Sequence, residues 1–265
     1  SKEKWERGFT KFDLETKQFE NLKLDSNLYS NIQTSKDGTK YILNFSDGDL
    51  PPNVVITDAD FGSMKALTNL NPWMNSKKLT RSELISNRDV NGEELKGVLY
   101  YPVDYEPGKK YPLVCEVYET FFDNGYNRNM NLIANQGYFV LRPSVDLEQG
   151  YPGEAWVKGI TSAINKLVDE GKVDNDKVGV HGVSYGGYAT SLLITQTDRF
   201  AAAINISGKV NIISFLGDSP KIGTRNYAAA EVGQDRIGGS LWDDPLKYFA
   251  TTAVLHADRI KTPHL

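Results

Sequence analysis

The sequence predicts an α/β fold over residues 79–265, preceded by an all-β segment over residues 1–78. Short runs of alternating apolar and polar side chains, separated by polar turns, fill the first segment. In the second segment, apolar runs typical of buried strands alternate with helical patterns, which is the order of a parallel sheet covered by helices. One strand–helix junction, residues 178–194, carries the pattern Gly-x-Ser-x-Gly. We therefore expect one β unit and one α/β unit.

The all-β segment contains predicted strands over residues 8–13, 41–45 and 54–57, and another short strand is expected to begin with Phe19 and Leu22. A polar turn, Ser-Lys-Asp-Gly-Thr-Lys at residues 35–40, leads into the strand over residues 41–45. Short strands at this spacing are typical of β-propeller blades or of a sandwich. Because a propeller needs about four blades or more to close, the segment has material for one or two blades.

The α/β segment opens with a hairpin turn at Asn91-Gly92. We expect strands over 97–101, 111–118, 138–142, 178–180 and 200–207, and helices ending at Gly137 and spanning about 155–171. The longer helix places a set of apolar side chains on one face, which should pack on the sheet: Trp156, Ile160, Ala163, Ile164, Leu167 and Val168.

Residues 182–186, Gly-Val-Ser-Tyr-Gly, lie between a predicted strand and a predicted helix. This order describes a nucleophile elbow, in which the serine stands on a strained turn. Gly182 and Gly186 are expected there for steric reasons, since only a residue without Cβ allows the strand and the helix to approach so closely. The helix N-terminus offers free backbone N–H groups to a developing oxyanion.

Residues 182–188 resemble the Gly-x-Ser-Tyr-Gly-Gly-Tyr signature of the prolyl oligopeptidase family of serine peptidases. The resemblance extends to residues 111–118, which are similar to the Tyr-Pro-x-x-x-x-Val-Tyr strand of that family. The family joins a β-propeller to an α/β-hydrolase domain and cleaves short peptides. The resemblance therefore implies an incomplete α/β-hydrolase domain over residues 79–265, preceded by the last blade or blades of a propeller over residues 1–78.

The resemblance also implies roles for single residues. Ser184 takes the place of the catalytic nucleophile, and the backbone N–H of Tyr185 and the hydroxyl of Tyr118 take the places of the oxyanion-hole donors. Tyr227 takes the place of a substrate-binding tyrosine. A core-capping role for Tyr118 and a packing role for Tyr227 stay open. After Tyr118 the chain reads Glu119-Thr120-Phe121, where relatives usually have Gly-Gly-Pro or Ala-Gly-Pro.

A catalytic serine needs an imidazole that takes its proton and a carboxylate that orients the imidazole. In α/β-hydrolases the acid and then the histidine follow the serine along the chain. His181, His256 and His264 do not fit this order, and Asp258 precedes the strand after which the acid is expected. We therefore expect the acid, the base and the remaining propeller and hydrolase polypeptide outside residues 1–265. Expressed alone, this segment is predicted to be inactive and not to form a stable monomer.

Three functions are compatible with these residues. The first is a serine peptidase that hydrolyses short peptides through an acyl-enzyme on Ser184. The second is a non-catalytic binding or structural fragment of a multi-chain assembly, and the third is a carboxylesterase of the same fold. The propeller-like segment favours peptides, because in the relatives the propeller excludes large folded substrates.

The composition excludes several other classes of protein. A net charge of -4 and a pI near 5.5 leave no basic patch for nucleic acid. No apolar run approaches the roughly 18 residues of a membrane span. The single cysteine, Cys115, excludes an internal disulfide, and neither a metal nor a cofactor is expected. The sequence leaves the compartment open, and the resemblance favours a periplasmic or secreted protein.

Overall fold

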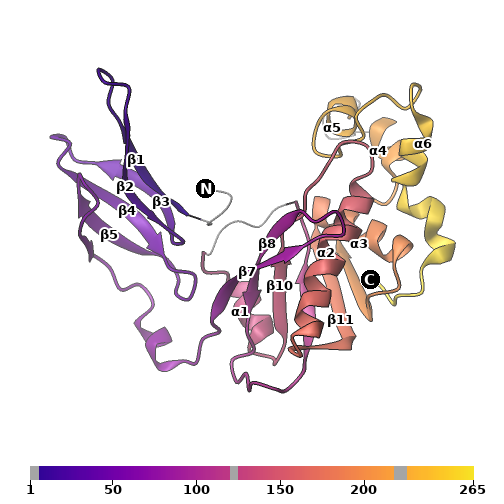
Figure 1. Cartoon of the computed structure of the whole chain (residues 1–265), viewed down its shortest axis with the longest axis horizontal. Helices are drawn as coiled ribbons and strands as arrows, with labels where there is room; N and C mark the ends of the chain where they lie inside the picture. The colour runs from indigo at the N-terminus through magenta and orange to yellow at the C-terminus, as the bar shows by residue number, and fades with distance from the viewer. Residues whose placement is uncertain (1–5, 120–124, 218–225) are drawn as a thin grey trace. The chain divides into compact units, whose positions relative to one another are not determined.

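The computed structural model describes residues 6–119, 125–217 and 226–265 (Figure 1). The chain divides into two compact units. The first unit comprises residues 1–83, 100–103 and 122–136, and the second comprises residues 84–99, 104–121 and 137–265. The domain boundary predicted between residues 78 and 79 stays a prediction.

The first unit contains two antiparallel arrangements. A hairpin joins β1 (Arg7–Phe12) to β2 (Phe19–Asp25), and a four-stranded sheet follows in sequence order, with β3 (Leu28–Thr34), β4 (Lys40–Ser46), β5 (Asn53–Asp58) and β6 (Met64–Ala66). A small core holds the unit together, consisting of Leu43, Val55 and Phe61. A four-stranded sheet of this kind suits a propeller blade, and its membership in a propeller stays a prediction.

Strand β3 was not among the predicted strands. Its pairing with β4 shifts register between Ser30 and Gln33, and Asn31 adopts a φ of 52°. A β-bulge of this kind interrupts the alternation of apolar and polar residues on which strand prediction depends. The remaining elements of the unit are η1 (Pro72–Ser76) and α1 (Arg128–Ala134).

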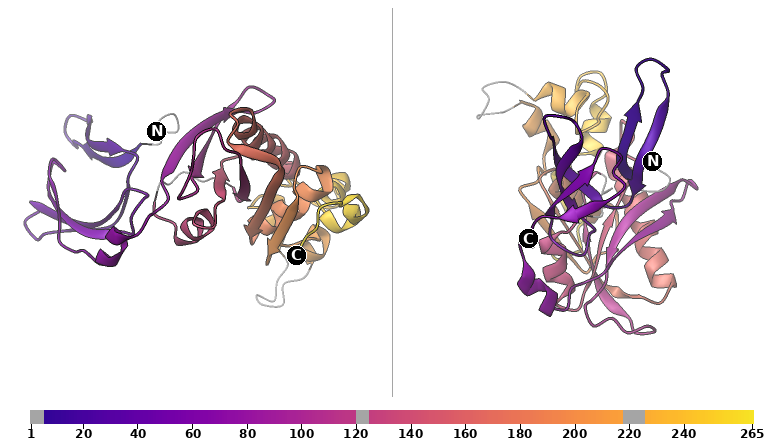
Figure 2. Two further views of the ribbon diagram at one scale, coloured as in Figure 1. Left: turned by 90° about the horizontal axis from the view of Figure 1, so that it is seen from below. Right: turned by 90° about the vertical axis from the view of Figure 1, so that its left-hand side faces the viewer.

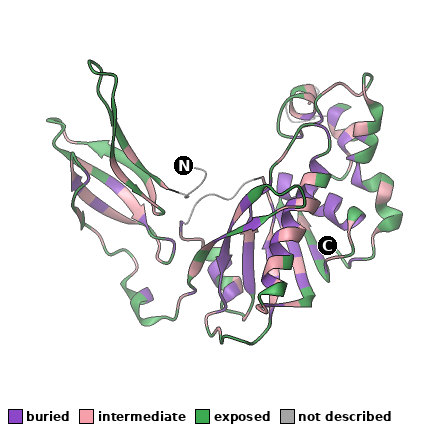
Figure 3. Ribbon diagram, viewed as in Figure 1, coloured by how far each residue is buried: buried purple, intermediate pink, exposed green. Residues whose placement is uncertain are grey.

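A six-stranded sheet forms the centre of the second unit. Its strands are β7 (Ser82–Arg88), β8 (Glu94–Tyr100), β9 (Tyr111–Glu116), β10 (Phe139–Pro143), β11 (Val173–Val183) and β12 (Ala202–Ile206), in the order β12-β11-β9-β10-β8-β7. Strands β9 to β12 pair in parallel. Buried residues concentrate in this sheet and in the helices on it, whereas β1 to β3 are largely exposed (Figure 3).

Two helices, α2 (Pro152–Asp169) and α3 (Tyr185–Gln196), pack against each other and against β11 (Figure 2). Five of the six apolar residues predicted on the α2 face are at most 1% exposed, namely Trp156, Ile160, Ala163, Ile164 and Leu167. Helix α2 begins three residues earlier than predicted, because Pro152 occupies its first turn, where a proline needs no N–H partner.

Shorter helical segments complete the second unit: α4 (Ile212–Gly217), α5 (Tyr227–Glu231), α6 (Pro245–Ala250) and η2 (Ala253–Arg259). Ile212, Ala230, Ile237 and Tyr248 form a buried cluster with Leu216 among them. Within the described ranges, no helix combines the length and the apolar character needed to cross a membrane.

The sheet order creates a reversal point at β9. The chain passes from β9 to β10 on one side and then returns to β11 on the other side of β9. In open parallel sheets, such a reversal leaves a crevice at the carboxyl ends of the strands, where ligands bind. The carboxyl ends of β9 and β11 are adjacent, since Glu116 pairs with His181. This position in the fold is where the Gly-x-Ser-x-Gly turn lies.

Candidate active site

Ser184 occupies a strained backbone position between β11 and α3. Its φ is 58° and its ψ is -115°, a region that residues with a Cβ rarely adopt. Strain of this kind costs about 1–3 kcal/mol and persists only where the surroundings enforce it. The side chain is exposed and makes no capping hydrogen bond to α3. The turn therefore presents the hydroxyl at the surface rather than using it to stabilise the helix.

Glycines enforce this turn. A Cβ on Gly182 would lie less than 3.0 Å from the backbone of Gly186, and a Cβ on Gly186 would lie equally close to the carbonyl oxygen of Val117. A Cβ on Gly187 would likewise lie less than 3.0 Å from the backbone of Gly208, in the loop after β12. The predicted steric role of Gly182 and Gly186 is thus confirmed, and the packing at Gly187 extends it to a third glycine.

Backbone hydrogen bonds fix Ser184 between the ends of two neighbouring strands. The Ser184 N–H donates to the carbonyl of Ile206 at 2.8 Å, at the end of β12. On the other side, the Val117 N–H donates to the carbonyl of His181 at 2.9 Å and extends the pairing of β9 with β11. The Tyr188 N–H donates to the Ser184 carbonyl at 3.1 Å, which begins α3 directly after the serine.

Tyr118 lies at the end of β9, beside the elbow. Its carbonyl accepts a hydrogen bond of 2.8 Å from the indole N–H of Trp156, which fixes its backbone. Its ring meets the ring of Tyr185 edge-on, at 6.2 Å between centroids. The structure therefore brings together Ser184, Tyr185 and Tyr118, the three residues predicted for nucleophile and oxyanion hole. Thr120 and Phe121, where the chain departs from its relatives, lie outside the described residues.

Tyr185 supplies a backbone donor and a buried ring. Its N–H belongs to the first turn of α3, where backbone N–H groups lack partners within the helix. Its side chain is 1% exposed and contacts the rings of Trp156 and Tyr188, with centroids 5.0 and 5.7 Å away. Burial raises the pKa of the Tyr185 phenol, so that it stays protonated. The packed ring holds the backbone N–H in place beside Ser184.

Sequence reasoning missed a set of polar residues around these tyrosines. Glu119 forms an ion pair of 2.7 Å with Arg236, and Gln234 donates hydrogen bonds to Glu119 and to the Tyr118 hydroxyl. Asp235, whose side chain is fully buried, pairs with Lys209. Burial raises the pKa of the Asp235 carboxyl, and the ammonium of Lys209 opposes that shift. Gln234, Asp235 and Arg236 follow the Tyr227 stretch as a short polar run, which is common on protein surfaces and does not by itself indicate a site.

Tyr227 begins α5 and packs against the buried cluster that includes Ala230 and Tyr248. Its ring also meets the ring of Trp242 edge-on, at 6.4 Å between centroids. These contacts describe a packed position. The assignment of Tyr227 to a substrate pocket stays a prediction.

The three histidines lie away from the position a general base would need. His181 is three residues before Ser184 on β11, roughly 10 Å along the strand. His264 pairs with Ala203, which is level with Val180, and is therefore farther from the carboxyl end of the sheet. His256 lies in η2, where its Nε2 is 3.0 Å from the carbonyl of Phe249. Burial lowers the pKa of His181, which therefore stays neutral at pH 7.

The single cysteine is poorly placed for chemistry. The Cys115 thiol is fully buried in β9, and burial raises its pKa to about 12. No group of three or more histidine, cysteine or acidic residues suited to a metal ion occurs among residues 6–119, 125–217 and 226–265.

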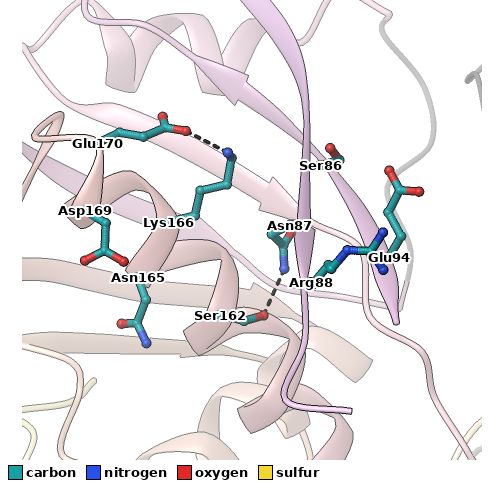
Figure 4. Close-up of a pocket in the computed structure, with 9 residues that line it drawn as sticks. All are labelled: Ser86, Asn87, Arg88, Glu94, Ser162, Asn165, Lys166, Asp169 and Glu170. Atoms are coloured by element: carbon teal, nitrogen blue, oxygen red, sulfur yellow. Dashed lines mark hydrogen bonds and ion pairs between the residues drawn. The ribbon is translucent and has the colours of Figure 1, made fainter. Parts of the chain in front are cut away.

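A second polar region is a groove between β7 and α2, lined among others by Asn87, Ser162 and Lys166 (Figure 4).

Comparison with known proteins places this geometry in a family. Residues 125–265, more than half of the chain, match the prolyl oligopeptidase family. The uncharacterized peptidase YuxL of Bacillus subtilis is 26% identical over 262 residues, covering 90% of this chain and 39% of YuxL. Dipeptidyl-peptidase 5 of Porphyromonas gingivalis is 28% identical over 176 residues, covering 59% of this chain and 24% of that protein.

Solved structures share the fold. A puromycin-hydrolyzing peptidase of Mycobacterium tuberculosis superposes with a TM-score of 0.78 at 23% identity, covering 96% of this chain and 40% of that one. An acylaminoacyl peptidase in complex with a chloromethyl ketone superposes with a TM-score of 0.76 at 19% identity, and the match covers 93% of this chain and 40% of that one. The chain thus spans well under half the length of these relatives. It has the α/β-hydrolase fold and belongs to the prolyl oligopeptidase family of peptidases.

Proposed function

We propose that the chain carries the nucleophile of a serine peptidase that hydrolyses short peptides through an acyl-enzyme on Ser184. The observation that carries the proposal is the backbone of Ser184, held at a φ of 58° by glycines on both sides, with its hydroxyl exposed at the reversal point of the sheet. A strained serine in this position is the structural context that a nucleophile elbow requires. Membership in a family of peptidases supports the same assignment.

The residues around Ser184 suggest how the reaction proceeds. Ser184 Oγ forms a bond to the scissile carbonyl carbon while a base takes its proton. The Tyr185 N–H and the Tyr118 hydroxyl donate hydrogen bonds to the carbonyl oxygen as it becomes negative. The C–N bond then breaks, the leaving amine takes the proton, and water hydrolyses the ester on Ser184 to regenerate the enzyme.

We also propose that the base and its carboxylate partner come from polypeptide outside these 265 residues. None of the three histidines in the chain lies beside Ser184, as their positions on β11, in η2 and opposite Ala203 indicate. The relatives are longer than this chain and offer room for such residues. On this proposal, residues 1–265 expressed alone are inactive.

Short peptides and small aminoacyl amides are the proposed substrates. Relatives are named as a dipeptidyl-peptidase, a lasso peptide isopeptidase, an acylamino-acid-releasing enzyme and a puromycin-hydrolyzing peptidase, and these names support the proposal. An ester would be hydrolysed through the same acyl-enzyme, so an assay must compare both bonds.

The test compares the complete gene product with its Ser184→Ala variant on three chromogenic substrates. These are a dipeptide p-nitroanilide with a free amino terminus, an N-acetylaminoacyl p-nitroanilide, and p-nitrophenyl acetate. We expect turnover of at least one anilide and a loss of roughly 10⁶-fold in the variant. Turnover of the ester alone would indicate a carboxylesterase, and turnover of none of the three would favour a binding or structural role. Undiminished hydrolysis by the variant would overturn the assignment of Ser184.

A further inference from the structure

We propose that Gln234 is a positioning residue for the Tyr118 hydroxyl, held in place by Glu119 and Arg236. The proposal rests on the proposed function, because it assigns Tyr118 to the oxyanion hole. It adds a residue that lies 116 positions from Tyr118 in the sequence and that no pattern in the sequence connects with the site.

The four side chains form a continuous chain of hydrogen bonds. Arg236 Nη2 donates to Glu119 Oε2 at 2.7 Å. Gln234 Nε2 donates to Glu119 Oε1 at 2.6 Å and to the Tyr118 hydroxyl oxygen at 3.2 Å. Each member is only partly buried or exposed, so a single pair would be weak in water. Several linked bonds hold the group in one arrangement better than any one of them.

Glu119 fixes which way the Gln234 amide faces. An ionised carboxylate only accepts hydrogen bonds, so the group facing it must be the amide nitrogen and not the amide oxygen. Both Glu119 oxygens are engaged, one by Gln234 and one by Arg236. The nitrogen carries two hydrogens, and the second is free to point at Tyr118. The amide orientation therefore follows from the charge of Glu119.

The hydrogen bond from Gln234 determines which way the Tyr118 O–H group can donate. The phenol oxygen accepts a hydrogen bond from Gln234, so its own hydrogen must be donated elsewhere. The Tyr118 ring contacts that of Tyr185, the residue after Ser184. On the proposed function, the Tyr118 hydroxyl donates its hydrogen to the oxyanion formed at Ser184. A hydrogen bond accepted by a hydroxyl also polarises its O–H bond and strengthens the one it donates.

The backbone around Gln234 is itself anchored. Asp235, the next residue, is buried and pairs with Lys209, and its N–H donates to the carbonyl of Ala229 at 3.0 Å. Arg236 adopts a φ of 55°, and its carbonyl accepts a hydrogen bond of 2.6 Å from the Gly150 N–H. With Asp235 turned inward, the residues on either side of it both reach Glu119.

The test is a double-mutant cycle in the complete gene product, with Gln234→Ala, Tyr118→Phe and the double variant. We expect Gln234→Ala to lower kcat by about 5- to 10-fold with little change in KM, the effect of one lost hydrogen bond. In the Tyr118→Phe background the same change should have no further effect, because the hydroxyl that Gln234 positions is absent. Gln196→Ala, an exposed glutamine at the far end of α3, is the matched control and should keep wild-type kinetics.

A second variant separates the loss of the hydrogen bond from a change in the structure of the loop that carries Gln234. Gln234→Glu keeps the shape of the side chain, but its carboxylate cannot donate to Tyr118 and repels Glu119. It should lower kcat at least as much as Gln234→Ala. Unchanged kcat in Gln234→Glu, or effects that multiply in the double variant, would overturn this proposal alone. A wild-type protein without Ser184-dependent turnover would overturn the proposed function and this proposal together.

Discussion

The elbow at Ser184 and the groove between β7 and α2 are two polar regions of the same unit, but they are built in opposite ways. The groove has a volume of about 780 Å³, and several of the side chains that line it are paired with one another. Asn87 donates to Ser162 at 2.9 Å, and Lys166 pairs with Glu170 at 2.7 Å (Figure 4). At the elbow, by contrast, the hydroxyl of Ser184 is exposed on a strained backbone.

A groove on the surface is therefore a weaker indication of a catalytic site than a strained backbone beside several hydrogen-bond donors. The groove lies beside β7, the edge strand of the sheet, whereas Ser184 lies where β9 and β11 end side by side. A strained turn has a cost and is retained where the surroundings enforce it. Salt bridges between partly exposed side chains, such as Lys166–Glu170, contribute little and are common on surfaces.

Among substitutions that distinguish the elbow from the groove, we expect the largest effect on turnover at Tyr118. Tyr118→Phe removes one donor from the oxyanion hole and keeps the ring that meets Tyr185. We expect kcat to fall by roughly 10²–10³-fold while KM changes little. Steady-state kinetics on the preferred anilide give the answer. An unchanged kcat would leave Tyr118 as a packing residue at the end of β9.

The next effect concerns the glycines that hold the turn. Gly186→Ala places a Cβ against the Val117 carbonyl, and we expect a loss of about 1–3 kcal/mol in the free energy of unfolding. Urea denaturation measures it. Gly239→Ala is the matched control, because a Cβ there meets no atom within 4 Å. Equal stabilities of the two variants would show that the elbow is not tightly packed.

A third prediction concerns pH and the strand that leads to the elbow. Burial lowers the pKa of His181 below the usual value for a histidine, about 6.5, so the unfolded chain binds more protons than the folded one as the pH falls below that value. His181 therefore contributes a loss of stability on acidification through that range and none above it. Urea unfolding at pH 5 to 8 should show a shallower pH dependence in His181→Gln. Identical pH profiles would refute a buried neutral imidazole.

The smallest effect is expected in the groove. Asn87→Ala breaks the hydrogen bond to Ser162 and should cost about 1 kcal/mol of stability. Turnover should stay within about twofold of the wild type, as for substitutions outside a functional site. A fall in kcat comparable to that of Tyr118→Phe would break the contrast between the two regions and give the groove a part in the reaction.

The features that could be predicted best from the sequence are those determined by contacts between residues close together in the chain. The elbow was recognisable because the glycines around Ser184 are required by contacts within a few residues and with the next strand. Helix α2 was recognisable from its apolar face, with Trp156 fully buried. Strand β3 was missed because a bulge near Asn31 disrupts its alternation.

The polar surroundings of the site could not be predicted in the same way. Gln234 contacts Glu119 and Tyr118 across more than 110 residues, and only the folded chain brings them together. A short polar run such as Gln234-Asp235-Arg236 is common on protein surfaces and does not indicate which residues it contacts. The order of the strands, which places β9 beside β11, is what converts these separate segments into one site.

The most direct test of the central claim, that Ser184 is the nucleophile, is covalent labelling. The complete gene product is treated with a fluorophosphonate probe, digested and mapped by mass spectrometry, alongside its Ser184→Ala variant. We expect one modified residue, Ser184, in the wild type and no modification in the variant. A wild type that resists the probe, or a label that persists in Ser184→Ala, would contradict it.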